Sequence, residues 1–421
     1  MEENEYEEYK EKYFKNSVST LNKGFLLHIG IDGFKMINEN YGWDYGDYIL
    51  RETASCILSC ISDSQKVYKI ASDEFIILDT TSSDMTTASN LYDHICKHIN
   101  QFIEENNFAA VFTISAGILP LPDLSRTGYE EIIKRTDFSL TVAKQHGRNC
   151  CYIFQEEEYQ NFLRIREITN ELHSAVNHDF RGFSVCFQPI MDIRQDRLTG
   201  AEVLIRFTSK KFAQISPAEF IPLLETSGLI IPIGRWLMRE AITACRKIRT
   251  QLPDFKININ VSQVQITNSD VITDLINEMN ASGLPHTAIV IELTESILLE
   301  KNEKAQNFLK ELKQAGLQLA LDDFGTGYSN FHYLSELHPD IVKIDRGFTS
   351  KAITDKKEYY LLNQFSNMIH NLGLKLCIEG IETEDELQKI KLLKPDYCQG
   401  FYWGRSCPYD EFRKHFVDVD R

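Results

Sequence analysis

Apolar and polar positions alternate in short runs along the C-terminal half of the chain, and amphipathic stretches separate most of these runs. Residues 256–261 and 289–293 are typical of buried strands, whereas residues 305–315 and 358–372 have the apolar spacing of helices. Alternating strands and helices favour a parallel sheet. Seven strand-like runs carry a polar residue at or near their C-terminal end, where a TIM barrel assembles its site. We therefore predict an α/β fold, a TIM-like (β/α)8 barrel, over residues 179–421.

The most informative polar residues in this half are the adjacent Asp322 and Asp323. They follow the apolar run 317–321 and precede the turn at 324–327. Neighbouring carboxylates repel, so a clustered pair usually needs a cation beside it. Adjacent acids that share divalent ions form two-metal sites for cutting phosphate esters. A single pair is most often a solvated turn, but here the polar strand ending recurs down the whole half.

Several motifs stand at the ends of these runs. They are Gln188-Pro189-Ile190, Glu202-Val203-Leu204, Asn260-Val261-Ser262, Glu292-Leu293-Thr294-Glu295, Asp322-Asp323-Phe324-Gly325, Lys343-Ile344-Asp345, Glu379-Gly380-Ile381-Glu382 and Gln399-Gly400. In this order they make residues 183–412 resemble the EAL domain, the cyclic di-GMP phosphodiesterase family. Val203 replaces the usual alanine and removes no ligand. Ser406 stands where the family has proline, and because it lies past the site residues we expect it to matter little.

The resemblance implies a two-metal site with an assigned residue set. One ion would be held by Glu202, Asn260, Glu292 and Asp322, and the second by Asp322, Asp323 and Glu379. Oxygen ligands of this kind suit Mg²⁺ or Mn²⁺ better than zinc, and such ions lower the pKa of bound water.

The same resemblance assigns further residues to catalysis and binding. The catalytic residues would be Lys343, which orients the water, together with Glu379 and Glu382; the substrate contacts would be Gln188, Arg206, Asp345 and Gln399. Glu295 would anchor the loop that runs from Asp322 to Leu334.

The N-terminal half, residues 1–155, interleaves strand-like and helical runs in an order that favours an α+β domain with a mixed or antiparallel sheet. Its motifs are Asp32-Gly33-Phe34-Lys35, Gly46-Asp47, Ala71-Ser72-Asp73-Glu74-Phe75 and Lys144-Gln145-His146-Gly147-Arg148. These motifs resemble the GGDEF domain, the diguanylate cyclase family, over about residues 24–154.

Three departures from that family affect its chemistry. Ala71 and Ser72 replace the signature glycines, and their Cβ atoms obstruct the approach of a nucleotide. Gly30 replaces the first metal-binding aspartate, which weakens a Mg²⁺ site with few protein ligands. We therefore expect a catalytically inactive, degenerate GGDEF domain.

Four nucleotide-facing residues of the GGDEF resemblance survive. They are the guanine-facing Asn38 and Asp47 and the phosphate-facing Lys144 and Arg148. Binding of GTP as an effector and a platform without ligand are equal alternatives at this point.

Between the halves, residues 156–178 carry a helical stripe of apolar positions: Phe162, Ile165, Ile168, Leu172 and Val176. This predicts a helical linker, either a coupling element or a plain spacer. Members of the EAL family work as dimers through the segments that correspond to 328–334 and 358–372. We therefore expect a homodimer whose packing the N-terminal domain biases.

Composition limits the remaining possibilities. The 421 residues suffice for two or three domains. The net charge of -16 argues against a nucleic-acid polymer as partner, although divalent ions would still allow a small dinucleotide. The ten cysteines show no Cys-x-x-Cys spacing, and no signal peptide or apolar stretch of roughly 20 residues is evident. We expect reduced thiols in a cytoplasmic protein; the sequence leaves open a membrane-anchored parent and an upstream sensor domain.

One further stretch could bind a metal. His94, Cys96 and His98 share a helical segment, and histidines four residues apart lie on one face of a helix. A solvated helix face is the more common explanation of such a pattern.

The sequence thus predicts hydrolysis of cyclic di-GMP to linear pGpG by a two-metal mechanism, with an inactive N-terminal domain. Two alternatives belong to other classes: a receptor that binds cyclic di-GMP without cutting it, and a signalling scaffold. Receptors of this kind usually lose a metal ligand, and none is lost here.

Overall fold

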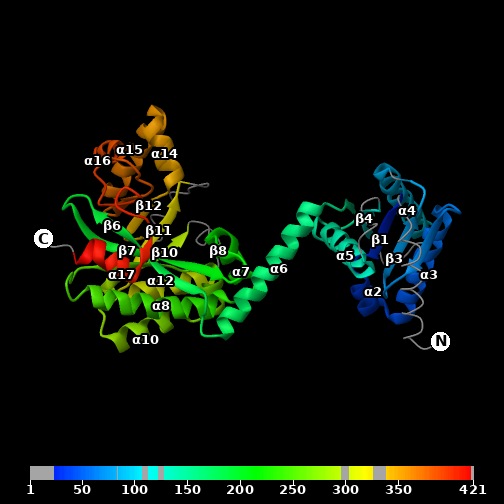
Figure 1. Cartoon of the computed structure of the whole chain (residues 1–421), viewed down its shortest axis with the longest axis horizontal. Coiled ribbons are helices and arrows are strands. Elements are labelled where there is room, and N and C mark those ends of the chain that lie inside the picture. Colours follow the sequence, from blue (N-terminus) through cyan, green and yellow to red (C-terminus); the bar gives the residue numbers. More distant parts are fainter. Residues whose placement is uncertain are drawn as a thin grey trace. The chain divides into compact units, whose positions relative to one another are not determined.

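The computed structural model describes residues 23–82, 84–106, 112–121, 128–294, 303–325 and 338–418. The chain divides into two compact units, Met1–Arg164 and Ile165–Arg421, whose elements are labelled in Figure 1. Among the helices of the described ranges, none has the length and apolarity needed to cross a membrane.

The first unit is built on a five-stranded mixed sheet. Its strands are β1 (Phe25–Ile31), β2 (Gln65–Lys69), β3 (Glu74–Asp79), β4 (Ile114–Pro120) and β5 (Cys151–Ile153), in the order β2-β3-β1-β4-β5. The central strand β1 runs antiparallel to β3 and β4, whereas β4 and β5 are parallel.

Helices cover both faces of this sheet (Figure 1). They are α2 (Phe34–Tyr41), α3 (Trp43–Cys60) and α4 (Met85–Glu105) on one face and α5 (Tyr129–Gln145) on the other. Alternate residues of a strand point to opposite faces: Leu27 and Ile29 pack with the α3 and α4 side chains, whereas Leu26 packs with Ile132 of α5. His28 and Gly30 therefore belong to the α5 face.

Helix α6 (Glu156–Asn177) covers the residues for which the apolar stripe predicts a helix. Its first half packs within the first unit, where Tyr159 joins Phe138 and Val142. In its second half, Ile168 and Leu172 are fully buried in the core of the second unit. The two units divide inside this helix, at residues 164 and 165, so each half of α6 is part of a core.

The second unit is a closed eight-stranded barrel, which confirms the predicted TIM-like architecture. Its strands are β6 (Phe183–Asp192), β7 (Arg197–Ser209), β9 (Lys256–Asn260), β10 (Ile289–Thr294), β11 (Gln318–Phe324), β12 (Ile341–Ile344), β13 (Lys375–Ile378) and β14 (Tyr397–Gln399). Seven of them run parallel. The eighth, β6, closes the ring by pairing antiparallel with both β7 and β14, a departure from a regular (β/α)8 barrel.

The remaining elements surround the barrel. They are β8 (Ala213–Ile215), α7 (Pro217–Thr226), α8 (Ile230–Ile248), α9 (Gln263–Asn268), α10 (Val271–Ser282), η1 (His286–Ala288), α12 (Glu303–Gln314), α14 (Arg346–Thr354), α15 (Lys356–Asn371), α16 (Glu384–Lys391), β15 (Cys407–Pro408), α17 (Tyr409–Phe412) and η2 (Arg413–Val417). The helices predicted at 305–315 and 358–372 are α12 and α15.

The barrel interior has an apolar layer and a charged layer. Val290, Ala320, Ile341 and Cys377 form one buried cluster. Two residues further along the same four strands stand Glu292, Asp322, Lys343 and Glu379. Because side chains two positions apart share a face, the strands place these charges together, above the apolar layer, at the C-terminal end of the barrel.

Candidate active site

The ammonium of Lys343 is the centre of the charged layer. Its Nζ atom lies 2.8 Å from Glu379 Oε1, 2.9 Å from Glu292 Oε1, 3.0 Å from Asp322 Oδ1 and 3.6 Å from Glu202 Oε2. The lysine side chain is 1% exposed. A buried charge of this kind requires paired charges around it, and the four carboxylates supply them.

Amide side chains fix two of these carboxylates. Glu202 accepts hydrogen bonds from Asn260 Nδ2 at 2.8 Å and from Gln399 Nε2 at 2.7 Å. Glu292 accepts one from Asn258 Nδ2 at 2.7 Å. The sequence analysis predicted Asn260 and Gln399 but missed Asn258, which stands two residues before Asn260 on the same face of β9 and could have been found by that spacing.

A β-bulge explains how two consecutive aspartates come to lie at one site. In a regular strand Asp322 and Asp323 would point to opposite faces. The register between β11 and β12 shifts between Leu321 and Phe324, and Asp323 has a φ of 56°. Bulges re-aim side chains next to active sites, and a left-handed residue there stores strain. The bulge places Asp323 close enough to Asp322 and Asp345 for their charges to raise its pKa, in addition to the effect of burial.

The electrostatics show that negative charge is in excess. Burial raises the pKa of Glu379 to about 8, and the neighbouring Asp322 and Glu202 oppose the lowering effect of Lys343. Burial likewise raises the pKa of Glu292 well above its ordinary value. For Lys343, burial alone would lower the pKa, but the surrounding carboxylates together raise it well above its usual range.

These residues fit divalent metal ions. One carboxylate oxygen from each of Glu202, Glu292 and Asp322 lies within 4.8 Å of the other two. The second oxygen of Glu292 is buried and has no hydrogen-bond partner among the described residues. An all-oxygen donor set of this kind suits Mg²⁺ or Mn²⁺. Within the described part of the chain, Asp323 and Glu379 do not belong to this group.

Two hollows contain predicted site residues. One, of about 250 Å³, is lined by Glu202 and by four more of them, Gln188, Glu379, Glu382 and Gln399. The other, of about 560 Å³, is lined by Arg206 and Asn260 among others. Leu204 lines both. Pockets for small ligands commonly span about 300–1,000 Å³.

Ser406 lies past the predicted site residues in the sequence, yet it contacts one of them in the structure. The Nη2 atom of Arg206 donates to Ser406 Oγ at 2.7 Å, and Nη1 donates to the Ile205 carbonyl at 2.9 Å. Strand β15 pairs with β6 through Cys407 and Phe187, which carries Ser406 back to the site. A proline at position 406 would lack the hydroxyl that accepts this bond.

The rim of the smaller hollow contains a basic residue that the sequence analysis missed. Arg346 lines the hollow and forms an ion pair of 2.5 Å with Glu382. Arg346 directly follows the Lys343-Ile344-Asp345 motif, and this position in the sequence could have identified it as a site residue. Asp345 accepts a hydrogen bond from Gly347 N and so caps α14. The predicted anchor Glu295 and the segment 328–334 lie outside the described residues.

In the first unit, the ammonium of Lys144 lies where Gly30 replaces the first metal-binding aspartate of the family. Gly30 lies opposite Glu74 in the β1–β3 ladder, and a Cβ atom on Gly30 would lie 2.9 Å from Lys144 Nζ. Lys144 lies 3.5 Å from Glu74, and His28 Nε2 lies 3.1 Å from it. The hydrogen bond with His28 lowers the pKa of Glu74, against the effect of burial, and the Lys144 charge lowers it further.

The four predicted nucleotide-facing residues fall in two places. Asn38 of α2 and Asp47 of α3 flank Gly46, where an added Cβ would lie 1.8 Å from Asn38 Oδ1. That Asn38 oxygen is buried and has no hydrogen-bond partner within the described segments. Lys144 and Arg148 lie at and just after the C-terminal end of α5. Because Lys144 forms an ion pair with Glu74, a phosphate would have to compete with Glu74 for the Lys144 ammonium.

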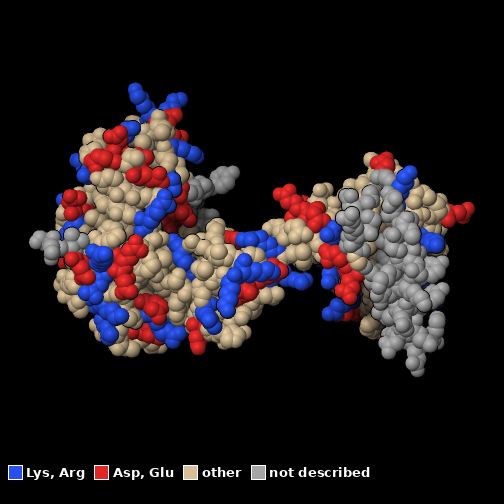
Figure 2. All heavy atoms as spheres, in the orientation of Figure 1, with Lys and Arg blue, Asp and Glu red and all other residues tan. Residues whose placement is uncertain are grey.

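The surface charges are mixed in sign. On the face drawn in Figure 2, Lys and Arg side chains are interspersed with Asp and Glu side chains in both units. This face shows no continuous basic stripe of the kind that meets a nucleic-acid backbone.

Comparisons with known proteins agree with this geometry. The EAL domain model matches residues 169–406, and the model of the diguanylate cyclase, GGDEF domain matches residues 6–150. The chain is 29% identical over 390 residues to the bifunctional diguanylate cyclase/cyclic di-GMP phosphodiesterase MucR of Pseudomonas aeruginosa, over 92% of this chain and 56% of MucR. It is 27% identical over 395 residues to the cyclic di-GMP phosphodiesterase PdeR of Escherichia coli, over 94% of this chain and 59% of PdeR. The chain therefore spans little more than half the length of these relatives.

A solved structure gives the same assignment for the second unit. The phosphodiesterase of MucR in complex with cyclic di-GMP superposes with a TM-score of 0.54 at 30% identity, covering 58% of this chain and 99% of that one. The EAL match takes in more than half of the present chain. The chain belongs to the EAL domain family, in the tandem form in which a GGDEF domain precedes the EAL domain.

Proposed function

We propose that the barrel unit hydrolyses cyclic di-GMP to linear pGpG. The observation that carries this proposal is the convergence of Glu202, Glu292, Asp322 and Glu379 on Lys343 at the C-terminal end of the barrel. With Asp323, five carboxylates face one ammonium, so two divalent ions would bring the site to neutrality. The names of MucR and PdeR, both cyclic di-GMP phosphodiesterases, support the choice of substrate.

The metal ions would be held as the family resemblance assigns them. Glu202, Asn260, Glu292 and Asp322 would bind one ion, and Asp322, Asp323 and Glu379 the other. When bound, such ions make a water nucleophilic at neutral pH and neutralise charge on the phosphate. Either Mg²⁺ or Mn²⁺ satisfies the donor set.

The protein's own residues would position the substrate and the ligands. Arg206 offers a guanidinium, which suits a phosphate oxygen, from a hollow that reaches Asn260. Gln188, Gln399 and Glu382 surround the second hollow, where the nucleotide would lie. Lys343 keeps three ligating carboxylates within 3.0 Å of its Nζ, and its charge would stabilise the negative charge that develops in the transition state.

A receptor without turnover is the second candidate for the barrel, and a signalling scaffold is the third. A receptor needs the binding hollows but not the carboxylates around Lys343. A scaffold needs neither, and it would leave three buried acids and the half-buried Glu379 at one point without a use. The cost of burying such charges therefore favours the enzyme.

The N-terminal domain, on this proposal, is an inactive cyclase relative that binds GTP as a regulator. Glu74 has Lys144 as an ionic partner and His28 as a hydrogen-bond partner, so a Mg²⁺ ion would have to displace both. The buried oxygen of Asn38 has no partner among the described residues, and rotation of this side chain would present a hydrogen-bond acceptor to a guanine N–H group. A homodimer formed through the barrel unit, with α15 at the interface, would receive this signal; Tyr360 and Leu361 of α15 are exposed apolar residues available for it.

The first prediction is that the purified chain converts cyclic di-GMP to pGpG with Mg²⁺ or Mn²⁺, as followed by chromatography of the products. Asp322→Asn and Glu202→Ala should each lower kcat by more than about 100-fold, since changes to groups that merely support metal ligands cost about 10–100-fold. Glu240→Gln, on the exposed side of α8, is the matched control and should leave the rate unchanged. Binding of cyclic di-GMP without turnover under either metal would move the barrel to the receptor class.

The second prediction concerns Ser406. Ser406→Ala should raise KM for cyclic di-GMP about ten- to 100-fold with kcat nearly unchanged, because hydrogen bonds to charged groups contribute about 1.5–3 kcal/mol. Ser406→Thr keeps the hydroxyl and should restore KM. Equal loss of activity in the alanine and threonine variants would show that the hydroxyl does not position Arg206.

The third prediction is that the chain makes no cyclic di-GMP from GTP. The assay should use the Asp322→Asn variant, because its phosphodiesterase is disabled and any cyclic di-GMP formed from GTP would not be hydrolysed. Gly30 and the ion pair between Lys144 and Glu74 are the physical reasons. Detectable synthesis in this background, beyond that of a Glu74→Gln control, would refute the inactive assignment.

The fourth prediction is that GTP changes the phosphodiesterase rate of the full chain but not that of residues 165–421. The shorter fragment starts at 165 because Ile168 and Leu172 belong to the barrel core. A ligand shifts a conformational balance only if it prefers one arrangement, so Asp47→Ala should abolish the response. If the full chain and the fragment have equal rates at every GTP concentration, the coupling through α6 does not exist.

A further inference from the structure

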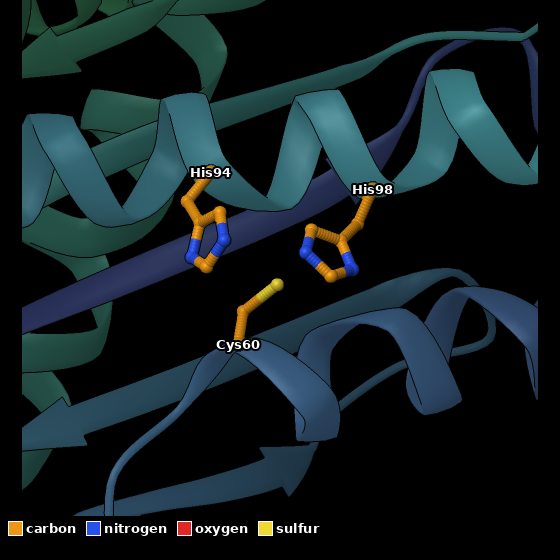
Figure 3. A group of neighbouring side chains, drawn as sticks. All are labelled: Cys60, His94 and His98. Carbon is orange, nitrogen blue, oxygen red and sulfur yellow. The ribbon is translucent and has the colours of Figure 1, made fainter.

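A cysteine and two histidines of the first unit face one another between two neighbouring helices. Cys60 is the last residue of α3, and His94 and His98 stand one turn apart on α4. One ligand atom from each residue lies within 4.8 Å of the other two. Figure 3 shows both imidazoles on the side of α4 that faces Cys60, with the sulfur directed toward them.

The imidazoles are available for a ligand. Their rings make an edge-to-face contact with centroids 4.7 Å apart. No hydrogen bond to a nitrogen of either ring is found in the segments that the structure describes. Cys60 and His98 are half-buried and His94 is exposed, so a small rotation of the side chains can adjust the ligand atoms without moving the helices.

The donor set selects a class of metal. A thiolate and two imidazoles are soft or borderline ligands, which suit Zn²⁺ and similar transition metals and not Mg²⁺ or Ca²⁺. Zinc accepts three protein ligands in a tetrahedral arrangement and leaves the fourth position to water or another ligand. The carboxylate site of the barrel has the opposite character, since all its predicted ligands are oxygen atoms.

The cysteine that faces the histidines in the structure is not the one that the local sequence suggests. Cys96 stands between the two histidines in the chain, but its sulfur is not part of the group of ligand atoms that Cys60, His94 and His98 form among the described residues. A residue two positions from each histidine points to another side of the helix. Packing of α3 against α4 brings Cys60 to the histidine face in its place.

We propose that Cys60, His94 and His98 form a binding site for one Zn²⁺-type transition-metal ion. Such an ion would link the C-terminal end of α3 to the middle of α4. Because α3 also carries Asp47, the ion would restrain the helix on which the proposed GTP site depends. The site itself does not depend on the proposed phosphodiesterase activity.

The test uses the reduced full-length chain and Co²⁺ as an optical probe. A thiolate bound to Co²⁺ gives a charge-transfer absorption that oxygen ligands do not give, so ions at the barrel carboxylates do not contribute. We expect this absorption to saturate at the intensity of one thiolate-bound Co²⁺ per chain and to disappear when Zn²⁺ is added. Cys60→Ser should abolish it, and His94→Gln or His98→Gln should weaken Co²⁺ binding by at least about tenfold.

Two cysteines provide matched controls. Cys56 lies one turn before Cys60 on α3, and Cys96 lies between the histidines on α4. The Cys56→Ser and Cys96→Ser variants should both keep the absorption. As a second readout, Zn²⁺ should raise the melting temperature of the wild type and of these controls more than that of His98→Gln. No absorption in the wild type, or absorption that survives in Cys60→Ser or is lost equally in Cys56→Ser, would overturn the proposal.

Discussion

The barrel strands can bring four carboxylates to one point because the buried ammonium of Lys343 stands between them. Glu202, Glu292, Asp322 and Glu379 come from four strands or their ends, and each lies within 3.6 Å of its Nζ atom. Like charges buried at this spacing would otherwise take up protons or force the strands apart. One ammonium does not balance them, and on our proposal the remaining charge is what attracts divalent ions, whose binding would in turn stabilise the folded barrel.

The first unit deals with its charges in the opposite way. Glu74 lies opposite Gly30, which replaces the first metal-binding aspartate that the family resemblance implies. Lys144 of α5 forms an ion pair with Glu74, and His28 of β1 forms a hydrogen bond with it. Glu74 thus has its partners within the unit, whereas the barrel site keeps an excess of negative charge. This difference is the physical basis of our proposal that the barrel carries the chemistry and the first unit regulates it.

The parts of the structure that local patterns encode could be predicted from the sequence. The alternation of apolar and polar residues predicted the parallel strands, and the polar residues at the strand ends predicted the carboxylates around Lys343. The direction of β6 could not be predicted, because a strand's pattern does not encode which neighbour it joins. The bond between Arg206 and Ser406 joins residues 200 positions apart. Cys60 likewise meets His94 only through the packing of α3 against α4, whereas sequence proximity suggested Cys96.

The most direct test of the account is the anomalous scattering of Mn²⁺ in crystals of the full chain grown with Mn²⁺ and cyclic di-GMP. The account predicts one peak in contact with Glu202, Glu292 and Asp322, a second in contact with Asp323 and Glu379, and a phosphate of the nucleotide between the peaks and Arg206. The absence of any peak among these carboxylates at saturating Mn²⁺, with the nucleotide bound, would contradict it.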